Sequence, residues 1–215
     1  MDKKKTVPAK EEIYAALCRR HGKEVQDILR DSHVAIAGLG GLGSVISVAL
    51  ARAGVGHLHL IDFDQVDLEN LNRQQYRLKD IGRDKTECIK EYIAEFNPYL
   101  DVRIDTCRID ENNVRELFME DSIVCEAFDS PAAKSMLVDG FFTNYGKDKK
   151  MVSATGMAGY GDSNLIQTKK WNDRFYLCGD QVNGIENVGS LMAPRVGICA
   201  CHEANMIIQL LLENK

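Results

Sequence analysis

The segment Gly38-Leu39-Gly40-Gly41-Leu42-Gly43 matches the pattern G-x-G-x-x-G, which brings a phosphate to the start of a helix. Glycines allow a tight turn and a close approach of the backbone, and the free N–H groups of a helix N-terminus favour an anion. Asp62 lies at the end of the next expected strand, where a carboxylate can accept hydrogen bonds from ribose hydroxyls. We therefore expect Gly38, Gly40, Gly41, Gly43 and Asp62 to bind a nucleotide. Close packing of the helix on the sheet is the alternative role of the glycines.

Polar and basic residues follow Asp62, among them Asn70, Arg73 and Lys85. A dinucleotide needs little at this position beyond the ribose carboxylate. A triphosphate carries more charge than a glycine loop alone compensates, and an arginine and a lysine would supply the remainder. This segment therefore favours ATP over NAD, with a solvated charged loop as the alternative.

The elements that must position these residues alternate between strands and helices. Short apolar runs predict buried strands over residues 33–38, 56–61, 102–106, 122–127 and 151–155. Helical patterns cover residues 41–53, 85–96, 111–118, 131–145 and 193–212, and residues 164–168 and 174–177 suit antiparallel strands. This order predicts a Rossmann-like α/β fold with a mainly parallel sheet. We expect one domain over 1–215, with an N-terminal helical segment (1–31), a nucleotide-binding core (32–156) and an irregular C-terminal extension (157–215).

The composition limits the class of protein. The chain has 215 residues, 45% of them hydrophobic, and a net charge of −5 from 27 Lys+Arg and 32 Asp+Glu. A small negative charge argues against nucleic acid or a membrane surface as a partner, and no apolar run approaches the roughly 20 residues of a membrane-spanning helix. The basic N-terminus lacks the apolar stretch of a secretory signal, and seven scattered cysteines suit a reducing compartment. We expect a cytoplasmic location.

A longer motif points to a family. The stretch GLGGLGS…ARAGVGHLHLIDFDQVDLENLNRQ resembles the adenylation domain of the ThiF/MoeB/HesA family, which is related to ubiquitin-activating enzymes. The similarity continues through RDKTE, CEAFDS and LMAPRVGI, so it covers the chain from about Asp31 onward. Within the family, the chain looks most like the short ThiF-like proteins of thiamine biosynthesis.

This resemblance implies an activity and its residues. Members use Mg²⁺ and ATP to adenylate the C-terminal Gly-Gly carboxylate of a ThiS-like sulfur carrier and release pyrophosphate, and relatives are homodimers. By motif, Gly41 would lie near the α-phosphate, Asn70 and Arg73 would contact phosphates, and Lys85 would steady the α- and γ-phosphates. Asp129 would hold Mg²⁺ and face the incoming carboxylate. An ionised carboxylate needs no general base, so positioning and charge neutralisation would carry catalysis.

The sequence departs from the family pattern at several positions. Lys134 stands where larger relatives carry an arginine. Arg20 is a candidate for the N-terminal arginine that reaches the partner subunit's ATP. Cys178 borders the loop whose cysteine links to the carrier in some relatives. No CxxC pair is present, so we expect no zinc site. Asp129 has an alternative role as the cap of the following helix.

Two other functions fit parts of the same sequence. The family includes a tRNA-modifying dehydratase that adenylates a modified adenosine, although the charge of −5 does not favour RNA. An NAD-binding oxidoreductase or a non-catalytic nucleotide sensor would use the glycine loop, but neither explains a set of residues suited to a triphosphate.

Overall fold

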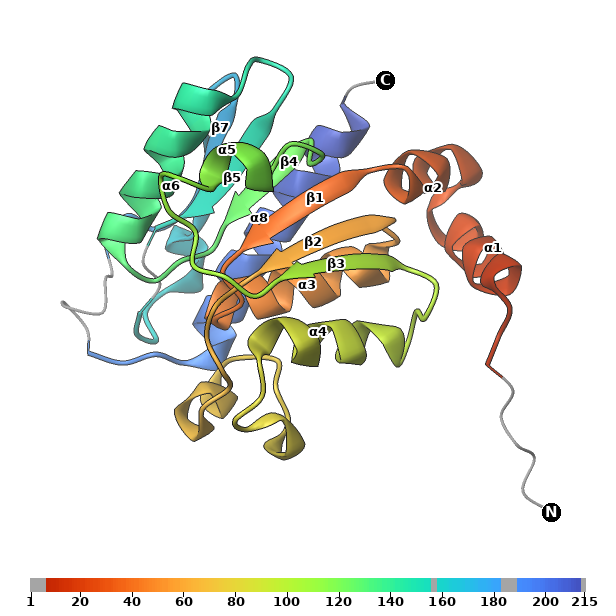
Figure 1. Cartoon of the computed structure of the whole chain (residues 1–215), viewed down its shortest axis with the longest axis horizontal. Coiled ribbons are helices and arrows are strands. Elements are labelled where there is room, and N and C mark those ends of the chain that lie inside the picture. Colours follow the sequence, from red (N-terminus) through yellow and green to blue (C-terminus); the bar gives the residue numbers. More distant parts are fainter. Residues whose placement is uncertain (1–6, 156–157, 183–188, 214–215) are drawn as a thin grey trace.

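The core of the protein is one mixed sheet, described by a computed structural model. The structure describes residues 7–155, 158–182 and 189–213. Within these residues seven strands form the order β3-β2-β1-β4-β5-β7-β6 (Figure 1). Neighbouring strands are parallel except for the antiparallel pair β6–β7. The expected Rossmann-like α/β fold is therefore confirmed, and the strands of the C-terminal extension continue the same sheet.

The elements follow the expected order. The strands are β1 (His33–Ala37), β2 (His57–Ile61), β3 (Asp101–Asp105), β4 (Ile123–Glu126), β5 (Lys150–Ala154), β6 (Gln167–Asn172) and β7 (Phe175–Gly179). The α-helices are α1 (Lys10–His21), α2 (Lys23–Arg30), α3 (Gly41–Ala53), α4 (Lys85–Ala94), α5 (Val114–Leu117), α6 (Pro131–Asn144) and α8 (Ala193–Leu212). Short 3-10 helices are η1 (Leu68–Asn72), η2 (Leu78–Asp80) and η3 (Ser163–Leu165).

Two elements begin three residues later than expected because polar side chains form local turns. Helix α5 begins at Val114 rather than near residue 111, since the Asp110 carboxylate accepts a hydrogen bond from the Asn112 amide (2.8 Å). Strand β6 begins at Gln167 rather than at residue 164, because Asp162 accepts from the Asn164 amide (2.9 Å) and starts the η3 turn. Such Asx turns compete with regular structure.

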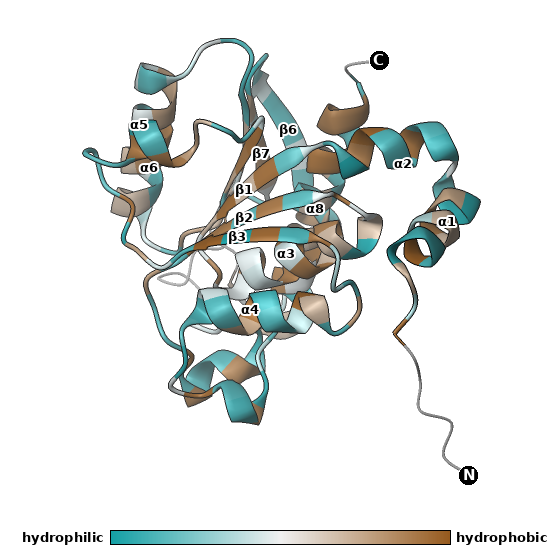
Figure 2. Ribbon diagram, turned by 45° about the vertical axis from the view of Figure 1, so that its right-hand side comes forward, coloured by the Kyte–Doolittle hydropathy of each residue, from teal (hydrophilic) through white to brown (hydrophobic). Residues whose placement is uncertain are grey.

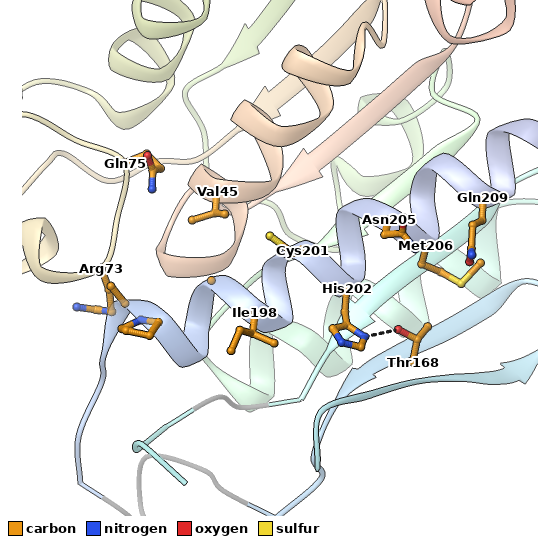
Figure 3. A pocket seen from close by; sticks show the side chains of 13 residues that line it. Val45, Arg73, Gln75, Thr168, Ile198, Cys201, His202, Asn205, Met206 and Gln209 are labelled. Carbon is orange, nitrogen blue, oxygen red and sulfur yellow. Dashed lines mark hydrogen bonds between the residues drawn. The ribbon is translucent and has the colours of Figure 1, made fainter. Parts of the chain in front are cut away.

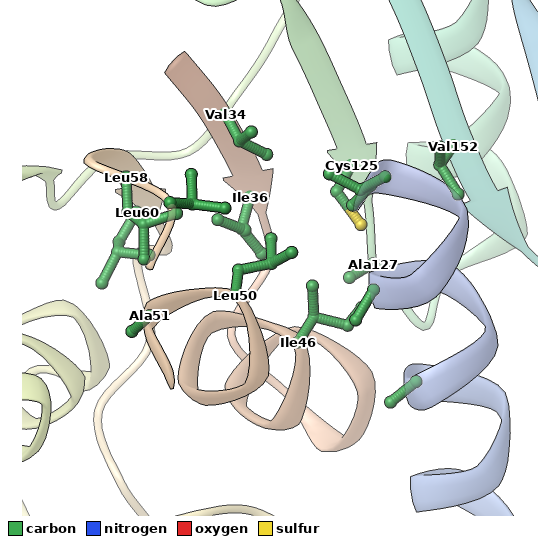
Figure 4. Packing of buried hydrophobic residues seen from close by; sticks show 14 of the residues in the cluster. Val34, Ile36, Ile46, Leu50, Ala51, Leu58, Leu60, Cys125, Ala127 and Val152 are labelled. Carbon is green, nitrogen blue, oxygen red and sulfur yellow. The ribbon is translucent and has the colours of Figure 1, made fainter. Parts of the chain in front are cut away.

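Successive residues of the central strands face two different helical layers. Val34 and Ile36 of β1 face the layer of α3, α4 and α8, where Ile46 and Leu50 pack on them (Figure 4). Ala35 and Ala37 face the layer of α5 and α6. The apolar strands lie between helices whose outer faces are polar (Figure 2). The two-sided burial explains why central strands such as β1 and β4 have few polar residues.

The parallel strands direct their carboxyl ends to one edge of the sheet. The loops after β1, β2, β3 and β4 all leave from that edge, while α2 leads into the amino end of β1 (Figure 1). Among the described residues, no helix is both long enough and apolar enough to cross a membrane.

One carboxyl group lies in the core between the sheet and α8. The side chain of Glu203 is completely buried, and Cys125 of β4 donates a hydrogen bond to its Oε2 (3.6 Å). Within the described chain, its Oε1 has no hydrogen-bond partner. Burial raises the pKa of Glu203 to about 8, an effect that nearby Lys134 opposes and Glu126 strengthens. Glu203 is therefore protonated in the folded protein at neutral pH.

Glu203 should make stability fall as pH rises. In the unfolded chain its pKa is near 4.5, so between pH 4.5 and 8 the unfolded state releases a proton that the folded state keeps. The free energy of unfolding of wild type should therefore fall between pH 5 and pH 8. In Glu203→Gln this fall should be smaller, by on the order of 2 kcal/mol. Urea unfolding at both pH values measures the difference, with exposed Glu213→Gln as the control. Parallel pH profiles for wild type and Glu203→Gln would contradict the prediction.

Candidate functional site

The loops at the carboxyl edge of the sheet surround a pocket of about 890 Å³. Nine of the residues singled out from the sequence line it: Gly38, Gly40, Gly41, Asp62, Asn70, Arg73, Lys85, Asp129 and Lys134. They come from the loops after three strands, from the segment between β2 and α4 and from α6, so the sheet brings together residues far apart in the sequence.

The glycines of the loop after β1 have different roles. Gly38 has φ +93°, a conformation that favours glycine. A β-carbon at Gly43 would lie 1.8 Å from the carbonyl oxygen of Gly38, so Gly43 lets helix α3 pack directly on the loop. A β-carbon at Gly41 would lie 2.9 Å from Val196 of α8. At Gly40 the nearest atom would be 3.9 Å away, which leaves the pocket open beside the first turn of α3.

Asp62 is fixed at the end of β2 by backbone hydrogen bonds. Its Oδ2 accepts from the Leu39 amide (2.6 Å) and its Oδ1 from the Asp64 amide (2.8 Å). Burial raises the pKa of Asp62, and the positive charge of Lys85 opposes the shift. Each carboxylate oxygen has a further lone pair, so Asp62 can still accept from a hydroxyl group of a ligand.

The basic side chains reach the pocket from the segment after β2. Lys85 is the first residue of α4, and its buried Nζ donates to the Asp64 carboxylate (2.9 Å). Arg73 follows η1 and donates to the Asn72 side chain (2.9 Å). Asn70, inside η1, accepts from the Asp67 amide (3.0 Å). These contacts place two cations beside the N-terminus of α3, an arrangement suited to a polyanion.

Asp129 follows β4 and lines the wall of the pocket formed by the loop after that strand. Its side chain is exposed, and none of the described residues pairs with its carboxylate. Ser130, rather than Asp129, is the N-cap of α6, since its Oγ accepts from the Ala133 amide (3.4 Å). The alternative role of Asp129 as a helix cap is therefore wrong. A carboxylate open to a phosphate-sized pocket fits Mg²⁺, which binds few protein oxygens together with phosphates and water.

A buried ionic network supports this wall. Glu126 is completely buried at the end of β4, and both of its carboxylate oxygens accept from Lys134 Nζ (3.0 Å each). The carboxylate also accepts from the Phe128 amide (2.7 Å) and the Ser153 hydroxyl (2.5 Å). Lys134 lines the pocket, but its charge is matched by Glu126. The network fixes the backbone one residue before Asp129.

Two further lining residues, Phe63 and Arg108, were not singled out from the sequence. The Arg108 guanidinium lies over the Phe63 ring, 3.9 Å from its centroid. They follow the carboxyl ends of β2 and β3 respectively. The sequence could have indicated both residues, because each follows an expected strand. It could not have indicated their contact, because that depends on the pairing of the two strands.

Comparisons with known proteins identify the family of this chain. The family model described as ThiF family matches residues 14–215. The chain belongs to the ThiF family. A ThiF-family relative, molybdopterin-synthase adenylyltransferase of Salmonella typhimurium, is 30% identical over 87% of this chain and 76% of its own. tRNA threonylcarbamoyladenosine dehydratase of Escherichia coli is 34% identical over 58% of this chain and 47% of its own.

Solved structures support the ThiF fold. The structure of the E. coli dehydratase in complex with ATP superposes with a TM-score of 0.84 at 22% identity, covering 97% of this chain and 98% of that one. An E. coli MccB structure with ATP superposes with a TM-score of 0.65 at 25% identity, covering 89% and 59%.

Three residues singled out from the sequence, Gly43, Cys178 and Arg20, do not line the pocket. Gly43 packs α3 on the loop, as described above. Cys178 lies in β7, fully buried, and burial raises the pKa of its thiol to about 12. Arg20 is exposed on α1, beyond the amino ends of the strands and away from the pocket (Figure 1). The roles predicted for Cys178 and Arg20 stay predictions.

A second hollow lies beside the pocket at the carboxyl edge of the sheet. Its volume is about 580 Å³, and it runs along the exposed side of α8 toward α3 and β6 (Figure 3). Ile198 and Cys201 line it from α8, and His202 contacts Thr168 of β6 (3.1 Å). Arg73 lines both hollows, so this surface adjoins the pocket at the carboxyl edge.

The close approach at Gly43 gives a stability prediction. Gly43→Ala places a β-carbon against the backbone of Gly38, so we expect the free energy of unfolding to fall by about 3 kcal/mol. Gly197→Ala is the matched control, because nothing lies within 4 Å of its β-carbon on α8. Alanine there should raise stability by up to about 1 kcal/mol. Urea unfolding measures both, and equal effects would refute the steric explanation.

The network of Glu126 and Lys134 gives a second prediction. Lys134→Met leaves a buried carboxylate without its cation, so we expect a loss of about 3 kcal/mol in the free energy of unfolding. Glu126→Gln combined with Lys134→Met should cost at least about 1 kcal/mol less than the sum of the two single changes. A double-mutant cycle by urea unfolding tests this coupling. Simple additivity would show that the two side chains do not depend on each other.

Proposed function

We propose that the protein is a cytoplasmic ATP-dependent adenylyltransferase that acts on the C-terminal Gly-Gly carboxylate of a ubiquitin-like, ThiS-like sulfur carrier. The observation that carries this proposal is one pocket lined by the glycine loop, Asp62, Arg73, Lys85 and Asp129. Among the described residues, the Asp129 carboxylate has no partner. Membership of the ThiF family and the name of the molybdopterin-synthase relative support the same class of reaction.

The arrangement fits Mg·ATP. The triphosphate would lie over the N-terminus of α3, where the open space at Gly40 admits it, with Arg73 and Lys85 against its oxygens. Asp62 would accept a ribose hydroxyl. Asp129 would hold Mg²⁺, which supplies positive charge to the phosphates. Lys85 already pairs with the Asp64 carboxylate. When ATP binds, phosphate oxygens would replace that carboxylate as the partner of Lys85.

Catalysis would require positioning rather than proton transfer. The acceptor carboxylate is ionised at neutral pH and would attack the α-phosphorus, with pyrophosphate as the leaving group. Negative charge then grows on phosphate oxygens, which Arg73, Lys85 and the backbone N–H groups of α3 would stabilise. The buried Glu126–Lys134 pair would keep the wall beside Asp129 rigid without adding net charge.

The identity of the acceptor and the assembly belong to the proposal as well. We propose the thiamine pathway, with the molybdopterin pathway as the alternative carrier source, since the curated relatives include molybdopterin-synthase adenylyltransferases.

We also propose a homodimer that uses the hollowed face of α8, where the apolar side chain of Ile198 is exposed and Arg73 lines the same hollow. Arg20 would then act on the second copy.

A second candidate is adenylation of tRNA. The fold of the E. coli tRNA threonylcarbamoyladenosine dehydratase covers nearly the whole chain, and that is the observation in its favour. The net charge of −5 is unfavourable for RNA.

ATP–pyrophosphate exchange tests the proposal. We expect Mg²⁺-dependent exchange with a carrier that ends in Gly-Gly, and none with the same carrier lacking those two residues. Asp129→Ala should lower the exchange rate by about 100-fold, because it removes the metal-binding carboxylate. Its urea unfolding should match that of wild type, since Asp129 is exposed and has no partner among the described residues.

The substrate panel separates the candidates. Parallel reactions contain a thiamine-type carrier, a molybdopterin-type carrier or total tRNA. Exchange with tRNA alone would establish the second candidate in place of the first. Tight ATP binding without exchange for any acceptor would overturn adenylation and identify a nucleotide-binding module.

A further inference from the structure

The sheet order determines where each part of a nucleotide would lie. Moving along the carboxyl edge, the strands are β4, β1, β2 and β3. Asp129 follows β4, the glycine loop follows β1, and Asp62 follows β2. A nucleotide with its phosphates at the glycine loop and its ribose at Asp62 therefore directs its base toward the end of β3.

The end of β3 carries an arginine stacked on an aromatic ring. Arg108 lies in the loop after β3, and Phe63 directly follows Asp62. Both side chains are exposed and both line the pocket, with the buried Ile61 and Ile109 beside them. The guanidinium lies 3.9 Å from the ring centroid. An arginine and a phenylalanine stacked in this way form a flat surface at the pocket wall.

Arg108 is not engaged by a carboxylate. Among the described residues, none forms an ion pair or hydrogen bond with its guanidinium. Arg103, within β3 itself, instead pairs with Asp105 (3.0 Å) and Glu120 (3.7 Å). The open face of Arg108 is therefore available to a ligand, and guanidinium groups stack readily on planar π systems.

We propose that Arg108 is the base-stacking residue of the nucleotide pocket, held flat by Phe63 so that its second face covers the adenine ring. The inference rests on the proposed function, because it assumes that ATP is the ligand. It assigns Arg108 to the base and not to the phosphates, which lie two strands away along the edge. The planar guanidinium, rather than positive charge alone, is the feature that matters.

Three variants separate stacking from charge. Arg108→Ala removes both the plane and the charge, and Arg108→Lys keeps only the charge. Arg103→Ala is the control for the loss of one exposed arginine outside the pocket. Calorimetry of the full chain with Mg·ATP and with inorganic tripolyphosphate measures affinity for a ligand with a base and for one without it.

We expect Arg108→Ala and Arg108→Lys each to weaken ATP binding about fivefold, with tripolyphosphate binding unchanged. Arg103→Ala should bind both ligands as wild type does. Loss of tripolyphosphate affinity in Arg108→Ala, restored in Arg108→Lys, would overturn the inference and assign Arg108 to the phosphates. Unchanged ATP affinity in both Arg108 variants would overturn it while leaving the proposed function intact. Failure of the wild-type protein to bind ATP would overturn both.

Discussion

Helix α3 can begin beside the loop after β1 only because Gly43 has no side chain. A β-carbon there would lie 1.8 Å from the carbonyl oxygen of Gly38. This contact brings the N-terminus of the helix to the carboxyl edge of the sheet, where its free N–H groups face the pocket. The position of Lys85 matters for an anion because the helix end already lies at the same pocket. The other polar groups of the pocket add to a site that backbone packing creates.

The parts of the site that follow from local sequence were predictable. Gly38 and Asp62 directly follow the apolar runs that define β1 and β2, and strand ends determine on which edge such residues lie. The contact of Phe63 with Arg108 was not predictable in the same way, because it requires β2 and β3 to be neighbours in the sheet. Strand boundaries also shifted where an aspartate such as Asp162 formed a turn with the next amides.

The two buried carboxyl groups, Glu126 and Glu203, could not be predicted from a sequence pattern. Glu126 lies in an apolar strand and Glu203 in an apolar helix, yet both are completely buried. Their surroundings differ. Among the described residues, Glu126 has Lys134 as a counter-ion and three hydrogen-bond donors in all, whereas Glu203 accepts one hydrogen bond, from Cys125, and burial raises its pKa. Only the packing of α6 and α8 against the sheet decides which carboxyl group is paired. The adjacent wall with Asp129 depends on that packing.

Helix α8 lies near the end of the chain, but its first turn helps to form the pocket. Val196 would meet a β-carbon at Gly41, and it lines the same cavity as the glycine loop. During synthesis on a ribosome, the glycine loop would therefore emerge long before the residue that packs beside it. A nascent chain that ended before α8 would have an open, unsupported loop. The pocket is thus complete only after α8 has been synthesised and has packed beside the glycine loop.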